Sequence, residues 1–338
     1  MTAHRGSVTI ADVARHAGVS PATVSRVMNG RFAGEPEVAE RVRRSADELA
    51  YAPSPLARSL ALGRTHAVAF VVPDLANPAF QSVLAGLSKT AALDGYRVLV
   101  ADSGESPGEE GPLATEIRRR TDAIVLCAPR MPEDELVALA GQLQPLVLIN
   151  RRIPQIAVPS LSIDYRAGIG ALAQHLYDLG HRSFAYVYGP ERSASNAHRE
   201  RGLDDFVHDH PDVRMERIPA GAGSEDGRVA AGTVQASGAT AALAFNDLVA
   251  IGLIGGLRDR GLSVPGDISV TGFDDIPLAQ YIAPALTTAS VSHAELGVLA
   301  WQRMHALMGG EQPGHDVVFQ PRVEVRDSTG PAPTPQAD

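Results

Sequence analysis

From residue 66 onward, short apolar runs alternate with amphipathic segments along the chain. The runs HAVAFVVP, RVLVAD, AIVLCAP and LVLIN predict strands, and between them apolar residues recur at helical spacing, as from Phe80 to Ala91. After SLSID the pattern starts again, with a further amphipathic helix and the strands SFAYVYG, AALAF and DISVTGF. Strands that alternate with helices form parallel sheets covered on both faces. We therefore expect two doubly wound parallel-sheet subdomains of the α/β class.

The first sixty residues have a different pattern, which predicts three short helices. Thr9 precedes a helical repeat and has Asp12 three residues later, as in a capping box. Gly18 ends that helix, Ser20 can cap the next one, and Pro21 suits a first helical turn. Two helices joined by a glycine-containing turn in a three-helix unit match the helix-turn-helix DNA-binding pattern, although a small protein-interaction domain has the same spacing.

In the helix-turn-helix geometry the second helix enters the major groove by its N-terminal end. Arg26 carries a fork of donors that matches guanine O6 and N7, and Pro21 and Ala22 offer apolar contact to a thymine methyl group. Hydroxyl and amide side chains suit phosphates. The candidate DNA contacts of this unit are Thr9, Ser20, Pro21, Ala22, Thr23, Ser25, Arg26 and Asn29.

Charge and composition agree with this division. Residues 1–64 hold nine Arg against six Asp plus Glu, a net charge of +3. Because the whole chain has a net charge of −9, residues 65–338 carry −12. A basic segment on an acidic body is typical of a part that meets a polyanion. The chain has no apolar run of about 18 residues and no apolar leader, and its lone cysteine, Cys127, lies in an apolar run. These features predict a buried thiol and a cytoplasmic protein with no membrane span.

Two motifs carry a family resemblance. VTIADVARHAGVSPATVSRVMNG, followed by YAPSPLARSLALGRT, resembles the N-terminal signature of the LacI/GalR (lactose-repressor) family of transcription regulators. The resemblance implies a hinge helix in the second motif, with Ala57 near a dimer axis and Leu60 wedged into the minor groove, where it bends the duplex. It also implies a core similar to periplasmic sugar-binding proteins.

These patterns together predict the domain boundaries. The headpiece spans 1–52, the hinge helix and linker 53–64, and the core 65–328. Within the core, the N-subdomain covers about 65–160 and 290–318, and the C-subdomain about 161–289 and 319–328. The Pro-rich tail, 329–338, is expected to be disordered.

Polar residues follow several predicted strands of the core. Because ligands of open α/β sheets bind beyond the carboxyl ends of the strands, these residues predict a cleft between the two halves. Amides, carboxylates and an arginine fork suit a small polyhydroxylated ligand. The resemblance places Arg199, Asn246 and Asp274 on ligand-binding positions. The full set of candidate effector contacts is Phe80, Asn150, Ser195, Arg199, Asn246 and Asp274.

Three further positions of the core are expected to differ from these ligand contacts. Asp247, after AALAF, is expected to cap the following helix. Ala222 stands where many family members place an aromatic residue, and Val291 where the family often has a glutamine near the cleft. These two departures keep an alternative open, a regulator of the same fold with no small-molecule effector.

Other chemistry finds little support. HDHPD, residues 208–212, resembles a metal cluster but has no partner of known spacing, so a solvated helix end is expected. There is no G-x-S-x-G, and no G-x-G-x-x-G after the first strand, which argues against a serine hydrolase and a dinucleotide-binding enzyme. We assign no catalytic residue, metal or cofactor.

The sequence therefore predicts a DNA-binding transcriptional regulator, a repressor, that is controlled by a small-molecule effector of carbohydrate type. Two headpieces on a homodimer, with a tetramer as the alternative, would read a pseudo-palindromic double-stranded operator. A solute-binding protein is the competing class, which the headpiece argues against.

Overall fold

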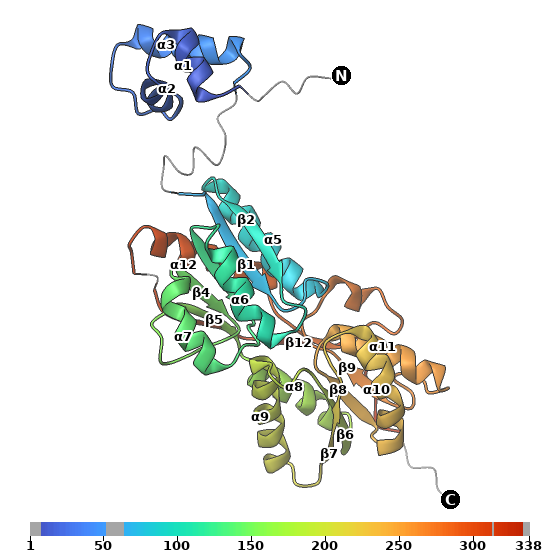
Figure 1. Cartoon of the computed structure of the whole chain (residues 1–338). Helices are drawn as coiled ribbons and strands as arrows, with labels where there is room; N and C mark the ends of the chain where they lie inside the picture. The colour runs from blue at the N-terminus through green and yellow to red at the C-terminus, as the bar shows by residue number, and fades with distance from the viewer. Residues whose placement is uncertain (1–7, 52–63, 313, 334–338) are drawn as a thin grey trace, which may run out of the picture. The chain divides into compact units, whose positions relative to one another are not determined.

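The computed structural model describes residues 8–51, 64–312 and 314–333, in two compact units that divide after His66 (Figure 1). Of the expected linker 53–64, all but Arg64 lies outside the described residues, and the hinge positions Ala57 and Leu60 lie there too.

The headpiece consists of three helices, α1 (Ile10–Ala17), α2 (Pro21–Met28) and α3 (Pro36–Glu48). They enclose a small core that contains Val13, Val24 and Val42, all fully buried. Both expected caps are present, since the backbone amide of Asp12 donates to the hydroxyl of Thr9 and that of Thr23 to the hydroxyl of Ser20. Gly18 ends α1 in the left-handed conformation, with φ of 66°, where glycine is favoured.

The first subdomain of the core is a six-stranded parallel sheet in the order β11-β5-β4-β3-β1-β2. Helices α5 and α12 pack against each other, as do α6 and α7. The elements are β1 (Ala67–Val72), α5 (Pro78–Leu93), β2 (Arg97–Asp102), α6 (Pro107–Arg118), β3 (Ala123–Cys127), α7 (Glu133–Leu143), β4 (Leu146–Ile149), β5 (Ser160–Ile163), α12 (His293–Met308) and β11 (Val317–Phe319).

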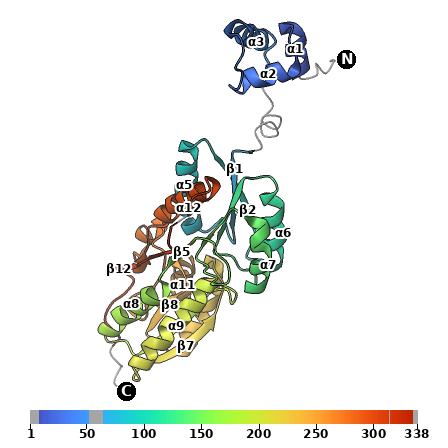
Figure 2. The ribbon, with the colours of Figure 1, turned by 90° about the vertical axis from the view of Figure 1, so that its left-hand side faces the viewer.

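The second subdomain is a four-stranded parallel sheet in the order β7-β6-β8-β9, with α8 packed on α9 and α10 on α11. Figure 2 shows the second subdomain following the first along the core. Its elements are α8 (Tyr165–Asp178), β6 (Ser183–Tyr188), α9 (Ala194–Asp209), β7 (Arg214–Pro219), α10 (Ser224–Ser237), β8 (Ala241–Ala244), α11 (Asp247–Asp259), β9 (Ser269–Thr271) and the 3₁₀ helix η1 (Pro277–Gln280).

The chain crosses between the subdomains three times: from β5 to α8, from β10 (Thr288–Ser290) to α12, and from β11 to β12 (Arg322–Glu324). β10 and β12 pair antiparallel in a small separate sheet. The boundary expected near residue 160 lies three residues later, because the whole of β5 pairs with β4 and β11 in the first sheet.

Glycine pairs let two of the helix pairs approach closely. A Cβ on Gly86 of α5 would strike the backbone of Ala294, and one on Gly297 of α12 would strike that of Val83. Gly227 of α10 and Gly252 of α11 are equally confined by the backbone of the facing helix. Since backbone meets backbone at these crossings, each pair forms a tightly packed unit.

The expectation of disorder from residue 329 onward is wrong for residues 329–333. Ser328 is buried, the Gly330 carbonyl accepts a hydrogen bond at 3.0 Å from Nε2 of His181, and the amide of Ala332 donates to the Leu179 carbonyl. The proline-rich composition misled because backbone polar groups, rather than apolar side chains, attach this segment to the second subdomain. Among the described residues, the structure has no helix long and apolar enough to cross a bilayer.

Candidate functional site

The candidate DNA contacts of the headpiece lie along α2 and at its start. Pro21, Ala22 and Arg26 are exposed, whereas Thr23, Ser25 and Asn29 are half-buried. The hydrogen bonds of these side chains are local, and those of Arg26 Nε to the Ala22 carbonyl and of Asn29 Nδ2 to the Ser25 hydroxyl are long, at 3.4 Å each. Their donors therefore remain free to exchange water for another partner. Thr9 and Ser20 have their hydroxyls committed to the caps of α1 and α2.

The six candidate effector contacts all line one cavity of the core. Phe80 comes from α5 and Asn150 follows β4 in the first subdomain, while the others come from the second: Ser195 and Arg199 from α9, Asn246 after β8 and Asp274 after β9. The carboxyl ends of parallel strands meet at this edge of each sheet, which is why distant residues converge. The cavity is small, about 30 Å³.

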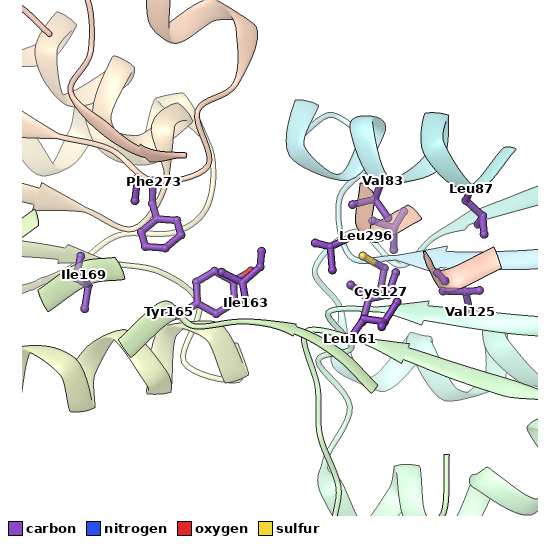
Figure 3. Packing of buried hydrophobic residues seen from close by; sticks show 14 of the residues in the cluster. Val83, Leu87, Val125, Cys127, Leu161, Ile163, Tyr165, Ile169, Phe273 and Leu296 are labelled. Atoms are coloured by element: carbon purple, nitrogen blue, oxygen red, sulfur yellow. The ribbon is translucent and has the colours of Figure 1, made fainter. Parts of the chain in front are cut away.

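Arg199 is the most deeply placed charge of the cavity, with 1% of its surface exposed. Its guanidinium lies over the rings of Tyr165, Phe245 and Phe273, at 4.3, 4.7 and 4.2 Å from their centroids. Figure 3 shows the rings of Tyr165 and Phe273 on the side of the second subdomain, in the same buried hydrophobic cluster as Val83, Cys127 and Leu296 of the first. The rings hold the cation in place but accept no ordinary hydrogen bond from its edge.

Several buried polar atoms of the cavity have no hydrogen-bond partner among the described residues. They are Nε and Nη1 of Arg199, Oδ1 of Asn150 and Nε2 of His293. Unpartnered buried polar groups cost free energy, and they mark places that water or a ligand completes. The cavity thus offers two donors from one arginine and an acceptor from an amide.

The expected cap of α11 is displaced by one residue. Asn246, not Asp247, is the N-cap, and its Oδ1 accepts from the Val249 amide at 2.8 Å. Asp247 is fully buried and accepts instead from the Ile276 amide and the Thr288 hydroxyl. Burial holds the pKa of Asp247 well above its usual value. The amide of Asn246 also donates to the Ala222 carbonyl at 2.9 Å, so both ends of this side chain are used by the fold.

Asp274 faces His293 across the junction of the subdomains, with 3.6 Å between Oδ1 and Nε2. Burial raises the pKa of Asp274 to about 7, although Arg199 acts against that rise. Burial likewise lowers the pKa of His293 to about 4. At neutral pH the histidine is therefore uncharged, and the carboxyl group is close to its titration midpoint.

The first subdomain contributes an ion pair that the sequence did not bring to notice. Glu105, after β2, binds the guanidinium of Arg130, after β3, at 2.7 and 2.9 Å, and both residues line the cavity. The amides of Arg130 and Met131 both donate to the buried carboxylate of Glu110 at 2.7 Å, which fixes the loop. Both residues of the pair follow strand ends, the same signal that identified Asn150 and Asp274.

The two departures from the family pattern have different outcomes. Ala222 does line the cavity, so a methyl group stands where a larger side chain would lie. Val291 is not among the described lining residues. It packs against a buried hydrophobic cluster to which both subdomains contribute, and His293, two positions later, lines the cavity instead.

Two further sequence expectations concern residues outside the cavity. The HDHPD segment does end α9, where His210 stacks on Phe206 with ring centroids 4.3 Å apart. Cys127 is a buried free thiol in β3, as expected from its apolar run.

Known proteins resemble both the headpiece and the core of this chain. A family model described as bacterial regulatory proteins, lacI family, matches residues 9–54, and one described as a periplasmic binding protein-like domain matches 173–329. The HTH-type transcriptional regulator GalR of Salmonella typhimurium is 32% identical over 327 residues, which cover 95% of each chain.

Solved structures share the fold over nearly the whole chain. The lac repressor dimer bound to operator and the anti-inducer ONPF has a TM-score of 0.83 at 24% identity and covers 96% of this chain and 99% of its own. A complex of the transcriptional regulator CelR with cellobiose has a TM-score of 0.69 at 24% identity, with coverage of 95% and 99%. The headpiece, the two-subdomain core and the identity to GalR together lead to one assignment: the chain is a transcriptional regulator of the lacI family.

Proposed function

We propose that the headpiece reads an operator through α2 and that a small polyhydroxylated ligand in the core cavity controls this reading. The observation that carries the proposal is Arg199, a buried guanidinium with two unpartnered nitrogens in a cavity lined by amides and carboxyl groups. Hydroxyl groups of a sugar can accept hydrogen bonds from both of these donors. The family to which the chain belongs consists of regulators, and we propose no catalysis.

On the DNA side, Arg26 is the base-reading residue of the proposal. It is exposed on α2, one turn from Pro21 and Ala22, which are exposed as well. We assign guanine to Arg26, a thymine methyl to Pro21 and Ala22, and phosphates to Thr23, Ser25 and Asn29. Thr9 and Ser20 act at the start of their helices, where an amide terminus favours a phosphate. The protein would act in the cytoplasm, where bacterial DNA lies.

The proposed assembly is a homodimer that presents two headpieces to a pseudo-palindromic operator. β2 is the edge strand of its sheet, and Leu99 and Val100 on it are exposed, together with Leu93 at the end of α5, which is 82% exposed. A second copy would cover these apolar side chains. The lac repressor that shares this fold was solved as a dimer on its operator.

The cavity also favours a second candidate function. Ligand sites are usually about 300–1,000 Å³, and this one is about 30 Å³ with a methyl group at Ala222. A regulator of the same fold that responds to no small molecule fits that volume directly. A ligand-controlled regulator requires the walls to separate before the ligand enters.

Titration calorimetry of the full chain with a panel of sugars and nucleosides, including cellobiose and ribose, distinguishes the two candidates. Saturable heat from one compound, with a matching change in affinity for operator DNA, supports ligand control. The absence of heat and of any thermal shift across the panel, from a protein that binds operator, favours the ligand-independent regulator.

A further inference from the structure

Arg130 has a position unlike that of any other cationic residue lining the cavity. It belongs to the first subdomain, in the loop between β3 and α7, yet its Nη1 lies 3.4 Å from the hydroxyl of Ser193 in the second. Its remaining donors are used within its own wall, by both carboxylate oxygens of Glu105 and by the Ala128 carbonyl at 3.0 Å. Each nitrogen of the Arg130 guanidinium therefore has a hydrogen-bond partner within the chain, unlike Nε and Nη1 of Arg199.

The loop that carries Arg130 is firmly held. Its amide and that of Met131 bind the carboxylate of Glu110, which is 1% exposed, and only 3% of the Arg130 side chain is exposed. The position of the guanidinium is thus set by the first subdomain alone. If the walls separate, the contact to Ser193 is lost and the Glu105 pair stays intact.

Ser193 is an equally defined point on the opposite wall. It is the N-cap of α9, where its hydroxyl accepts from the Asn196 amide at 3.2 Å and shares a hydrogen bond with Ser195 at 2.8 Å. The same helix carries Arg199. A contact at Ser193 therefore fixes the end of the helix that presents the proposed ligand contacts.

We propose that Glu105, Arg130 and Ser193 form a bridge, here the Arg130 bridge, that holds the two walls together when the cavity is closed and must break for a ligand to enter. The proposal rests on the proposed function only in its second part, since the bridge itself is a contact between two walls of this chain. The bridged cavity of about 30 Å³ is too small for a sugar, so the bridged state competes with binding. Arg130 is then a positioning residue, which acts through the separation of the walls.

The strength of the bridge follows from its geometry. One long hydrogen bond from a charged donor shifts an equilibrium by about fivefold, because net contributions of such bonds are modest. Ligand affinity falls by the fraction of protein in the competent state. Weakening the bridge should accordingly tighten ligand binding about fivefold, and strengthening it should have the opposite effect.

Two substitutions at Ser193 test this with opposite signs. Ser193→Ala removes the acceptor, whereas Ser193→Asp retains an N-cap and offers Arg130 a charged acceptor. A purely structural role in capping α9 would not move the wall distance in opposite directions for the two variants. In the double variant Arg130→Met/Ser193→Asp the effect of the aspartate should vanish. Arg152→Met, which breaks the exposed pair with Asp316, is the matched control for loss of an arginine ion pair.

The primary measurement needs no ligand. Spin labels at Glu133→Cys and Glu191→Cys, exposed positions on opposite subdomains, report the wall distance in the full chain, while Cys127 is buried. We expect longer distances for Ser193→Ala and Arg130→Met, and a narrower, shorter distribution for Ser193→Asp. Distances unchanged in Ser193→Ala and in Arg130→Met, or shifted the same way by alanine and aspartate, overturn the bridge.

Calorimetry of the same variants with cellobiose and with ribose then tests the link to binding. Tighter binding in Ser193→Ala and weaker binding in Ser193→Asp support it, and equal affinities in all variants overturn it. If no variant binds either sugar while the distances shift as expected, the bridge stands and the choice of ligand in the proposed function is what fails.

Discussion

The surface of α2 and the cavity of the core both gather polar side chains, but in opposite surroundings. Arg26 on α2 is exposed, and the hydrogen bond of its Nε to the Ala22 carbonyl is 3.4 Å long. Arg199 in the cavity is buried among three rings, and two of its nitrogens have no partner. The first arginine is exposed to bulk solvent before it binds, whereas the second is already buried.

This difference separates stability from recognition. An exposed side chain contributes little to folding, so changes on α2 should alter DNA binding alone. A buried unpartnered cation lowers the stability of the empty protein, so changes in the cavity should alter stability and ligand binding in opposite directions. Charge contacts on the exposed α2 surface should also weaken with salt far more than contacts in the closed cavity.

The largest effect is expected at Arg199. Arg199→Met removes the unpartnered charge and keeps much of the volume, so ligand affinity should fall by about 100-fold or more, as expected from losing two charge-assisted hydrogen bonds. The melting temperature of the empty protein should hold or rise. Thermal unfolding and calorimetry measure both, with Arg166→Met, an exposed arginine on α8, as the control. A marked loss of stability in Arg199→Met would contradict the contrast.

The pair Asp274 and His293 should reveal itself in the dependence of stability on pH. An aspartate whose folded pKa is raised to about 7 stabilises the fold less as pH rises from about 4 to 7. A histidine whose folded pKa is lowered to about 4 stabilises it less as pH falls from about 6.5 to 4. Over this range the two slopes oppose each other in the wild-type protein.

Single substitutions should expose each slope. From pH 5 to pH 8, the change in the melting temperature of Asp274→Asn should be about 5 °C more positive than that of the wild-type protein. The change for His293→Gln should be about 5 °C more negative than that of the wild type. Thermal unfolding at the two pH values measures this. The control is Asp267→Asn, whose carboxylate is exposed and caps a surface turn. Identical pH profiles for the wild type and both variants would show that Asp274 and His293 do not contribute to the pH dependence of stability.

Arg26→Ala should have the next effect, on DNA alone. Discrimination at one base position in each half-site should weaken by about 1–3 kcal/mol, with no change in the melting temperature. A binding-site selection experiment measures this, and Arg43→Ala, an exposed arginine on α3, is the matched control. An unchanged base preference would exclude Arg26 as the residue that reads the base.

Ser20 should give the smallest effect, and it separates capping from contact. Ser20→Ala should destabilise the headpiece by about 1 kcal/mol through loss of the α2 cap. Ser20→Asp should retain the cap and weaken operator binding, because a carboxylate faces phosphate. Circular dichroism of the full chain and a DNA-binding assay measure the two effects. Equal operator binding by the alanine and aspartate variants would place Ser20 outside the interface.

The fold was predictable where the hydrophobic pattern of the sequence is strong. Buried strands such as β3 and β4 are continuous apolar runs, which leave few alternatives. β7 (RMERIP) escaped prediction because it is an edge strand whose side chains are largely exposed or half-buried. Residues 290–318 were assigned to the first subdomain, but the strand β11 and its pairing were not predicted, since its partner β5 lies more than 150 residues earlier.

The cavity was predictable where a residue follows a strand end. Asn150 and Asp274 were found in this way, and Glu105 and Arg130 satisfy the same criterion. His293 carries no such signal, because it opens a helix in the first subdomain and reaches the cavity only through the crossover from β10. The exchange of roles between Asn246 and Asp247 was also beyond the sequence, since either residue type makes a good cap.

The crossovers have a consequence for how the chain folds as it is made. α5 needs α12 to cover its apolar face, yet about 200 residues separate the end of α5 from the start of α12. At about 5–20 residues per second, that face waits some 10–40 s during synthesis. The four-stranded sheet of the second subdomain and its helices α8 to α11 come from one continuous stretch that precedes α12, and only the segment after β12 is added to them later. The sheet of the second subdomain can therefore form first, and the first subdomain, although begun earlier, is completed only near the end of translation.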